Sequence, residues 1–217
     1  NAASVFMEKA PRTVELDRSY SEQNLKYDIA QVRALRAFAY FYMVRIWGDV
    51  PLVTYSYDNG TFPSMPRTDA QTVLSYAKAE LLTAIKDLPY QYGTQTNLYY
   101  GSYGAQWQGK LFNKLSAYSV LAHICAWQGN YAEAETYSSF ILDHASEINA
   151  KYTSIADLTS ETGLFYSNAS VKGSRILGFN FAHNDNEATQ SGHLEQLTLL
   201  IHWYKNPILK YTFQRTA

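Results

Sequence analysis

The sequence predicts an all-α fold in which paired helices repeat and long loops are inserted between them. Apolar residues recur at helical spacing over residues 21–47, 68–88, 110–128 and 131–145. The segments between the first three carry the glycines and prolines that are typical of loops. Small residues also recur at the offsets of a repeated helix pair. Together these observations indicate a helical repeat scaffold with long loop insertions.

The first predicted helix spans residues 21–47 and ends at Gly48, which can take the left-handed conformation that closes a helix. Arg36 and Arg45 lie on this helix and are expected to pair with carboxylates, Arg45 with Asp49 four residues later. We expect its apolar face to consist of Leu25, Ile29, Val32, Leu35, Phe38 and Phe41. The helix-borne rings are expected to pack in the core, namely Phe38, Tyr40, Phe41, Tyr42, Trp47, Tyr118 and Trp127.

The next helices have equally clear boundaries. The helix over residues 68–88 is expected to begin with a capping box, formed by Thr68 and by Gln71 three residues later. The helix over residues 110–128 is expected to end at Gly129, and its partner follows directly. Beyond residue 145 the pattern loosens. There we expect a short helix over 155–158, an extended segment over 175–181 and an amphipathic helix over 193–203.

Two copies of a tetratricopeptide-like motif are visible. The later copy has large and small residues at Tyr118, Leu121, Ala122, Gly129, Tyr131 and Ala134, and the earlier helix supplies Ala77, Leu81, Ala84 and Pro89. Ala77 and Ala134 are 57 residues apart. The usual period of about 34 leaves roughly 23 extra residues, close to the length of the loop over residues 90–109. Long insertions in compact helical folds usually carry function.

Composition excludes several classes of protein. The formal net charge is −1, from 18 basic and 19 acidic residues, so no overall field attracts nucleic acid or anionic lipid. Aromatic residues make up 15% of the chain against 17% charged residues, a balance that suits binding of sugars or peptides by flat rings. The single cysteine, Cys125, lies on an apolar helical stretch and is expected to be a buried, inert thiol.

The helix that contains Arg33, Arg36 and a run of aromatic residues leads into Gly48-Asp49-Val50-Pro51-Leu52. This arrangement resembles the SusD/RagB family of outer-membrane nutrient-binding lipoproteins, in which an Arg-Ala-aromatic helix leads into Gly-Asp-Val-Pro-Leu. The resemblance covers about residues 1–200, and the segment over residues 187–193 also resembles sequences of the family. It implies a single SusD-like helical domain over residues 1–217, as a fragment or truncated member that lacks a lipidated N-terminal part and a large C-terminal part.

The resemblance also implies a function in polysaccharide utilization and nutrient uptake. Members are surface-exposed lipoproteins of the outer membrane of Bacteroidetes-type bacteria, and a lipid anchor upstream of this chain would be the only link to the membrane. The protein would capture an oligosaccharide or another nutrient and pass it to a TonB-dependent SusC-like transporter. No bond would be made or broken, and no cofactor or metal would be needed.

The insertion over residues 90–109 holds the candidate ligand-binding residues, which are Asn97, Tyr99, Tyr100, Tyr103 and Trp107. Sugar rings have an apolar face that stacks on aromatic side chains, and their hydroxyl groups need amide partners. The loop offers both kinds of group. The alternative is structural, because these rings could instead fold back onto the helices or meet another part of the protein.

Two other functions are compatible with the residues. A tetratricopeptide-type module would bind a peptide or protein in a groove between its helices. A helical glycoside hydrolase would need two carboxylates facing each other across a cleft, and the sequence singles out no such pair. His183, Asp185, Glu187, His193 and Glu195 are metal-ligand types without a recognised metal-binding spacing, so we interpret them as solvated loop residues.

Overall fold

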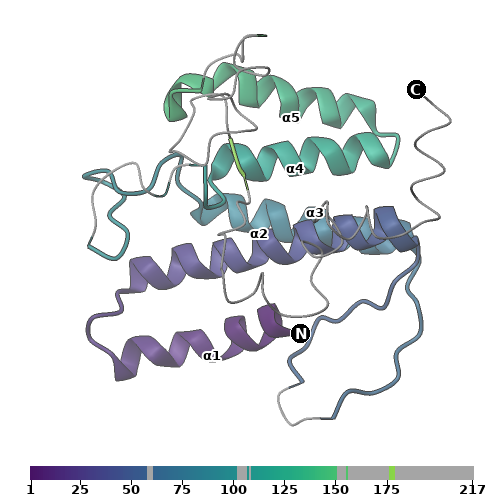
Figure 1. Cartoon of the computed structure of the whole chain (residues 1–217), viewed down its shortest axis with the longest axis horizontal. Helices are drawn as coiled ribbons and strands as arrows, with labels where there is room; N and C mark the ends of the chain where they lie inside the picture. The colour runs from purple at the N-terminus through teal and green to yellow at the C-terminus, as the bar shows by residue number, and fades with distance from the viewer. Residues whose placement is uncertain (58–60, 102–106, 108, 151–154, 156–175, 179–217) are drawn as a thin grey trace, which may run out of the picture. The chain divides into compact units, whose positions relative to one another are not determined.

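The computed structural model describes residues 1–57, 61–101, 107, 109–150, 155 and 176–178. Within these residues the chain forms five α-helices and one short 3-10 helix, η2, and the predicted all-α fold is confirmed. The helices are α1 (Ala2–Leu16), α2 (Glu22–Trp47), α3 (Ala70–Asp87), α4 (Lys114–Trp127) and α5 (Tyr131–Asp143), followed by η2 (Ala145–Ile148). Successive helices run in opposite directions, and each packs mainly against its neighbours in sequence (Figure 1).

Helix α2 has both of the predicted ends. Ser21 caps the first turn by accepting a hydrogen bond from the backbone N–H of Asn24 (3.1 Å). At the other end Gly48 has φ +69° and donates its N–H to the carbonyl of Val44 (2.9 Å). A Cβ atom at Gly48 would meet nothing within 4 Å, so glycine is favoured here by backbone conformation and not by space.

The buried face of α2 differs from the predicted one. Small residues form its centre, with Ala30, Ala34 and Ala37 each at most 1% exposed. Leu35, which was expected on the apolar face, is 48% exposed. The three alanines belong to the main core cluster together with residues of α3, and their short side chains let two helix backbones come together.

The prediction that the helix-borne rings pack in the core holds for Tyr40 and Phe41, which are both 4% exposed. It is wrong for Trp47 and Trp127, which are 63% and 53% exposed, and Tyr42 is also largely exposed. These three residues lie at or near the C-terminal ends of α2 and α4. A helix end extends beyond its neighbours, so its side chains find fewer packing partners.

Arg45 does not form the predicted ion pair with Asp49. Its guanidinium lies over the rings of Phe41, Tyr42 and Trp127, at 5.2 to 5.6 Å from their centroids. Asp49 instead accepts a hydrogen bond from the backbone N–H of Ala70 (2.9 Å), in the first turn of α3. The partial positive charge of a helix N-terminus attracts a carboxylate. Asp49 therefore binds the first turn of α3 and not the exposed Arg45.

Arg36 is paired with a carboxylate, as predicted. Its guanidinium binds Glu80 of α3, which also accepts a hydrogen bond from Arg33 (2.8 Å). Arg36 donates a further hydrogen bond to the hydroxyl of Ser4 (3.0 Å). This buried cluster therefore links α1, α2 and α3.

The remaining boundaries show where local signals were misread. Asp69 and not Thr68 caps α3, because its carboxylate accepts from the N–H of Thr72 (2.9 Å). Helix α4 begins four residues later than predicted, where Asn113 and Ser116 form a capping box. Helix α1 was not predicted, and Pro11 lies inside it. The predicted elements over 155–158, 175–181 and 193–203 lie largely or wholly outside the described residues.

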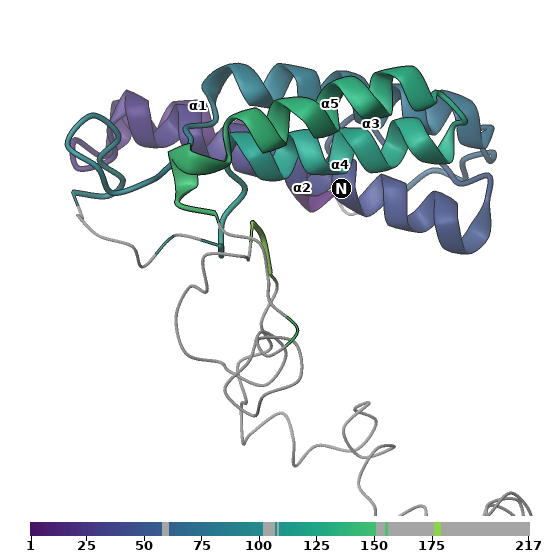
Figure 2. The same cartoon turned by 90° about the horizontal axis from the view of Figure 1, so that it is seen from above.

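The first copy of the repeat motif is buried as the pattern requires, but the second is buried only in part, since Tyr131 is 73% exposed and no residue of α5 is buried. Ala77, Leu81 and Ala84 on α3, with Leu121 on α4, are at most 1% exposed. Cys125 is also buried, and burial raises the pKa of its thiol, in agreement with the expectation of an inert side chain. Figures 1 and 2 show that the α1–α2 connection and the loop between α3 and α4 lie at the same end of the helices.

Candidate functional site

One amide side chain of α2 binds both ends of the loop between α3 and α4. Gln31 accepts a hydrogen bond from the backbone N–H of Phe112 (2.9 Å) and donates to the carbonyl of Phe112 and to the hydroxyl of Tyr92. Tyr92 in turn donates to the same carbonyl (2.9 Å). Both ends of the insertion are therefore held against the first half of α2.

Aromatic rings fill the space under the insertion. Tyr27 of α2 and Tyr92 and Tyr99 of the insertion are between 4% and 6% exposed. The Tyr27 and Tyr92 rings meet edge to face at a centroid distance of 5.3 Å, and Trp107 packs on Tyr99 at the same distance. These contacts form a second, smaller apolar cluster beside the main core.

Asp28 of α2 accepts hydrogen bonds from three tyrosine hydroxyls at the edge of these rings. Tyr20, from the α1–α2 connection, donates to Oδ2 (2.7 Å), and Tyr100 donates to the same oxygen (2.6 Å). Tyr99 donates to Oδ1. We call these four residues the Asp28 cluster. It joins the α1–α2 connection, α2 and the insertion through a carboxylate that is only 9% exposed.

The cluster changes the acidity of its phenols. Burial and the hydrogen bond to Asp28 raise the pKa of Tyr100 to about 12. The same two causes raise the pKa values of Tyr20 and Tyr99 well above the usual tyrosine value. All three hydroxyls therefore remain protonated at neutral pH and continue to donate to the carboxylate.

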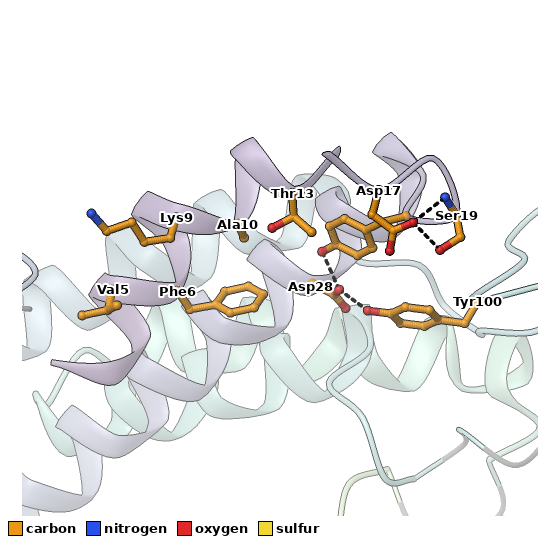
Figure 3. Close-up of a pocket in the computed structure, with 10 residues that line it drawn as sticks. Val5, Phe6, Lys9, Ala10, Thr13, Asp17, Ser19, Asp28 and Tyr100 are labelled. Atoms are coloured by element: carbon orange, nitrogen blue, oxygen red, sulfur yellow. Dashed lines mark hydrogen bonds between the residues drawn. The ribbon is translucent and has the colours of Figure 1, made fainter. Parts of the chain in front are cut away.

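Two grooves adjoin the exposed side of Tyr100. The first has a volume of about 460 Å³ and is shown in Figure 3. It is lined by Val5, Phe6, Lys9, Ala10, Thr13, Asp17, Ser19, Tyr20, Asp28 and Tyr100. The second has a volume of about 640 Å³ and is lined by Ser19, Ser21, Gln23, Asn24, Gln95, Thr96, Leu98, Tyr100 and Gly101. Both volumes lie in the usual range of ligand sites.

Tyr100 is the more exposed of the two exposed rings that line the first groove, the other being Phe6 at 38%. It is 51% exposed, and its ring stacks on that of Tyr20 at a centroid distance of 6.2 Å and an angle of 28°. Its backbone has φ +48° and donates to the side chain of Asn24 (3.2 Å). The unusual backbone conformation and this hydrogen bond help to hold the ring between the two grooves.

The predicted ligand-binding residues fall into three groups. Tyr99 and Trp107 pack inward, and Asn97 uses its carbonyl oxygen to accept a hydrogen bond from Tyr27 (2.8 Å). Tyr100 is half exposed and lines both grooves. Tyr103 lies outside the described residues. The insertion thus folds back onto the helices in part, and its role in binding remains a prediction.

The sequence reasoning missed Asp28 and Tyr20. Asp28 lies beside Tyr27 on the buried side of α2, and an acidic residue between apolar positions of a helix was the only available signal. Its partners Tyr99 and Tyr100 are 71 and 72 residues away in the sequence. No local pattern connects residues at such a separation.

The chemistry of the first groove suits binding. Asp17 accepts hydrogen bonds from the hydroxyl of Ser19 (2.7 Å) and from its backbone N–H (2.9 Å), and these bonds lower the pKa of its carboxyl. A general acid for glycoside hydrolysis needs the opposite shift. Asp28, the other carboxylate of this groove, is occupied by three phenols. Hydroxyl groups, carboxylate oxygens and an exposed ring remain as contacts for a ligand.

Comparison with known proteins decides the family. No family model matches the chain. A crystal structure of a SusD superfamily protein from Bacteroides thetaiotaomicron is 94% identical to it, covers 88% of this chain and superposes with a TM-score of 0.78. The chain belongs to the SusD superfamily. It spans 42% of the length of that crystallised protein.

Two further relatives support the fold of this SusD-superfamily chain. A SusD-like protein from Formosa agariphila is 26% identical over 194 residues, which make up 86% of this chain and 34% of that protein. A laminarin binding SusD-like protein is 24% identical, matches 70% of this chain and 28% of its own, and has a TM-score of 0.51. Among the described helices, none is long and apolar enough to cross a membrane.

Proposed function

We propose that this SusD-superfamily chain binds a glycan at the outer surface of the cell. The observation that carries the proposal is the half-exposed Tyr100 ring between two grooves lined by hydroxyl and amide groups. The apolar face of a sugar ring stacks on an aromatic side chain, and its hydroxyls pair with groups such as Thr13, Gln95 and Thr96. The grooves supply both kinds of contact.

A related protein of known structure supports this proposal. The relative that binds laminarin is a glycan-binding protein with this fold. We infer a binding role without catalysis, since both carboxylates of the first groove are engaged by hydrogen-bond donors. The pKa of Asp17 is moreover lowered, which is unfavourable for an acid catalyst.

The later steps of nutrient uptake complete the proposal. The bound oligosaccharide is passed to a TonB-dependent SusC-like transporter, and the protein is held at the outer membrane by an N-terminal lipid anchor. A stacking contact contributes about 1 kcal/mol, so a few contacts give the moderate affinity that suits capture followed by release. Co-purification of the protein with such a transporter from outer membranes tests this part separately.

The binding test compares two tyrosines. Tyr100→Ala removes the exposed ring and is expected to weaken glycan binding about fivefold, which corresponds to about 1 kcal/mol of lost stacking. Tyr131→Ala is the matched control, because Tyr131 is 73% exposed and begins α5 at the opposite end of the helices. Isothermal titration calorimetry against a panel of oligosaccharides measures both variants.

Three results would contradict the proposal. The unsubstituted protein could bind no member of the panel, or the two alanine variants could lose the same affinity. Release of shorter saccharides during incubation would show turnover and would favour the glycoside hydrolase alternative. Chromatography of the incubated oligosaccharides detects that outcome.

A further inference from the structure

The two grooves beside Tyr100 differ in charge and share a ring. We propose that they bind one continuous, uncharged oligosaccharide that crosses Tyr100, and that the acidic side chains of the first groove disfavour glycans with acid groups. The inference rests on the proposed function and adds the class of glycan to it.

Continuity follows from the residues that the grooves have in common. Ser19 and Tyr100 line both of them. The Tyr100 ring is 51% exposed and stacks on Tyr20, which widens the aromatic platform on the side of the first groove. A chain lying on this platform reaches polar groups on either side, with Thr13 in one groove and Thr96 in the other.

Charge is distributed unevenly along the site. Asp17 and Asp28 lie at the Tyr100 end of the first groove, and Lys9 lies at its far end (Figure 3). Lys9 also faces the carboxylate of Glu8 at 3.3 Å, which offsets its charge. The described lining of the second groove contains hydroxyl, amide and apolar groups but no charged side chain. An acid-bearing sugar near Tyr100 would therefore meet two carboxylates.

The basic residues close to this region in the sequence do not offset the negative charge of Asp17 and Asp28. Arg18 is exposed and does not belong to the described lining of either groove. Arg33 and Arg36, further along α2, are both bound to Glu80. A guanidinium is a strong partner for a bound carboxylate or sulfate, and the described lining of the two grooves contains none.

The hydrogen-bonding groups of the site favour the same class of ligand as its charge does, namely an uncharged sugar. The hydroxyl protons of Tyr20 and Tyr100 are donated to Asp28, so neither hydroxyl offers a proton to a bound acid group. The carboxylate of Asp17 only accepts. Sugar hydroxyls donate to such oxygens, whereas an ionised acid group carries no proton to donate. The Tyr100 end of the site thus favours hydroxyl groups.

The experiment measures neutral and acidic probes with the 217-residue chain. The neutral probes are hexasaccharides of glucose and mannose in several linkages, and the acidic probe is a galacturonate hexasaccharide. At about 20 mM salt the protein is expected to bind a neutral hexasaccharide at least tenfold more tightly than the acidic one. The ratio is expected to fall at about 500 mM salt, where charges are screened.

Asp17→Asn isolates the charge without disturbing the Asp28 cluster. It is expected to strengthen binding of the galacturonate hexasaccharide about threefold, the effect of one unit charge at roughly 7 Å in water, and to change neutral binding less than twofold. Glu15→Gln is the matched control, because Glu15 is an exposed acid near the end of α1 outside both groove linings. It is expected to change neither affinity.

Thr13→Ala and Thr96→Ala test whether one ligand occupies both grooves. Each is expected to weaken hexasaccharide binding about threefold, and a disaccharide is expected to respond to no more than one of them. If neither the neutral nor the acidic probes bind, the proposed function fails and this inference fails with it. If only the acidic hexasaccharide binds, glycan binding stands and the inference is wrong. If neutral and acidic probes bind equally, or only one threonine matters for the hexasaccharide, glycan binding stands and the inference is wrong.

Discussion

Two buried carboxylates on neighbouring helices are satisfied in different ways. Asp28 of α2 is 9% exposed and Glu80 of α3 is 8% exposed. Glu80 is bound by two guanidinium groups, those of Arg33 and Arg36. Asp28 is bound by three neutral phenol hydroxyls. Burial is almost equal, but the charge of Glu80 is compensated and that of Asp28 is not.

This difference distinguishes a carboxylate that stabilises helix packing, Glu80, from one that belongs to the candidate site, Asp28. Glu80 lies where three helices meet, and its arginine partners fix the packing of α1 and α3 on α2. Asp28 lies at the end of the helices and holds two connections that line grooves. Hydroxyl donors can satisfy a carboxylate without neutralising it, so its charge remains part of the site that a ligand meets.

The largest effect is expected from Glu80→Gln. It leaves Arg36, whose side chain is 10% exposed, without a counter-charge, and about 3 kcal/mol of the free energy of unfolding should be lost. Urea denaturation followed by circular dichroism measures this change. Glu133→Gln is the control, because Glu133 pairs with Lys78 on the surface and is 40% exposed, so a loss below about 1 kcal/mol is expected. Equal losses would contradict the distinction.

A smaller effect is expected from Asp28→Asn. The amide cannot accept all three phenol hydroxyls, and a loss of about 2 kcal/mol should result. Tyr20→Phe removes one donor and should cost about 1 kcal/mol. Hydrogen exchange should also become faster at the backbone N–H of Tyr100, which is held by Asn24. If Asp28→Asn unfolds at the same urea concentration as the unsubstituted protein, the Asp28 cluster does not stabilise the fold.

The smallest effect concerns pH. The pKa of Tyr100 is about 12 in the folded chain, against an ordinary value of 10.0. Below about pH 10 the phenol is protonated in both states, and its contribution to stability is complete. As the pH rises from about 10 to about 12 the unfolded chain ionises first, so stability should fall in this interval.

Absorbance of tyrosinate at alkaline pH, compared between the unsubstituted protein and Tyr100→Phe, isolates the titration of this residue. Asp28→Asn should move the titration of Tyr100 to lower pH, because the hydrogen bond to the carboxylate is lost while burial remains. A Tyr100 titration near pH 10 in the unsubstituted protein would show that the hydroxyl is not held by Asp28.

Local sequence signals predicted the helices where the physics is local. The ends of α2 follow from Ser21 and Gly48, because a cap and a helix stop each act within one turn. Helix α1 was not predicted. Pro11 normally interrupts a helix, but α1 continues through it and packs on α2. Thr68 and Asp69 are both good caps, and the prediction chose Thr68 because Gln71 completes a capping-box pattern with it, whereas Asp69 is the cap.

The candidate site was predictable only in part. The composition of the insertion pointed to Tyr100, since rings among glycines and amides are unusual in a loop. It did not show which rings would turn inward. Tyr99 and Tyr100 are adjacent, yet one is 6% and the other 51% exposed, because the Tyr99 ring packs against Tyr27 on a distant segment and Tyr100 does not belong to that apolar cluster. Tertiary contacts of this kind leave no trace in local spacing.

The two ends of the loop between α2 and α3 are bound to each other directly. Val50 and Thr68 exchange two backbone hydrogen bonds (3.0 and 3.2 Å), and the carboxylate of Asp49 accepts from Ala70. A loop closed by such a clasp can double in length for about 0.6 kcal/mol. The loop can therefore be lengthened while the two helices keep their alignment, provided that Val53 is kept, because its backbone exchanges hydrogen bonds with the buried Tyr40 of α2.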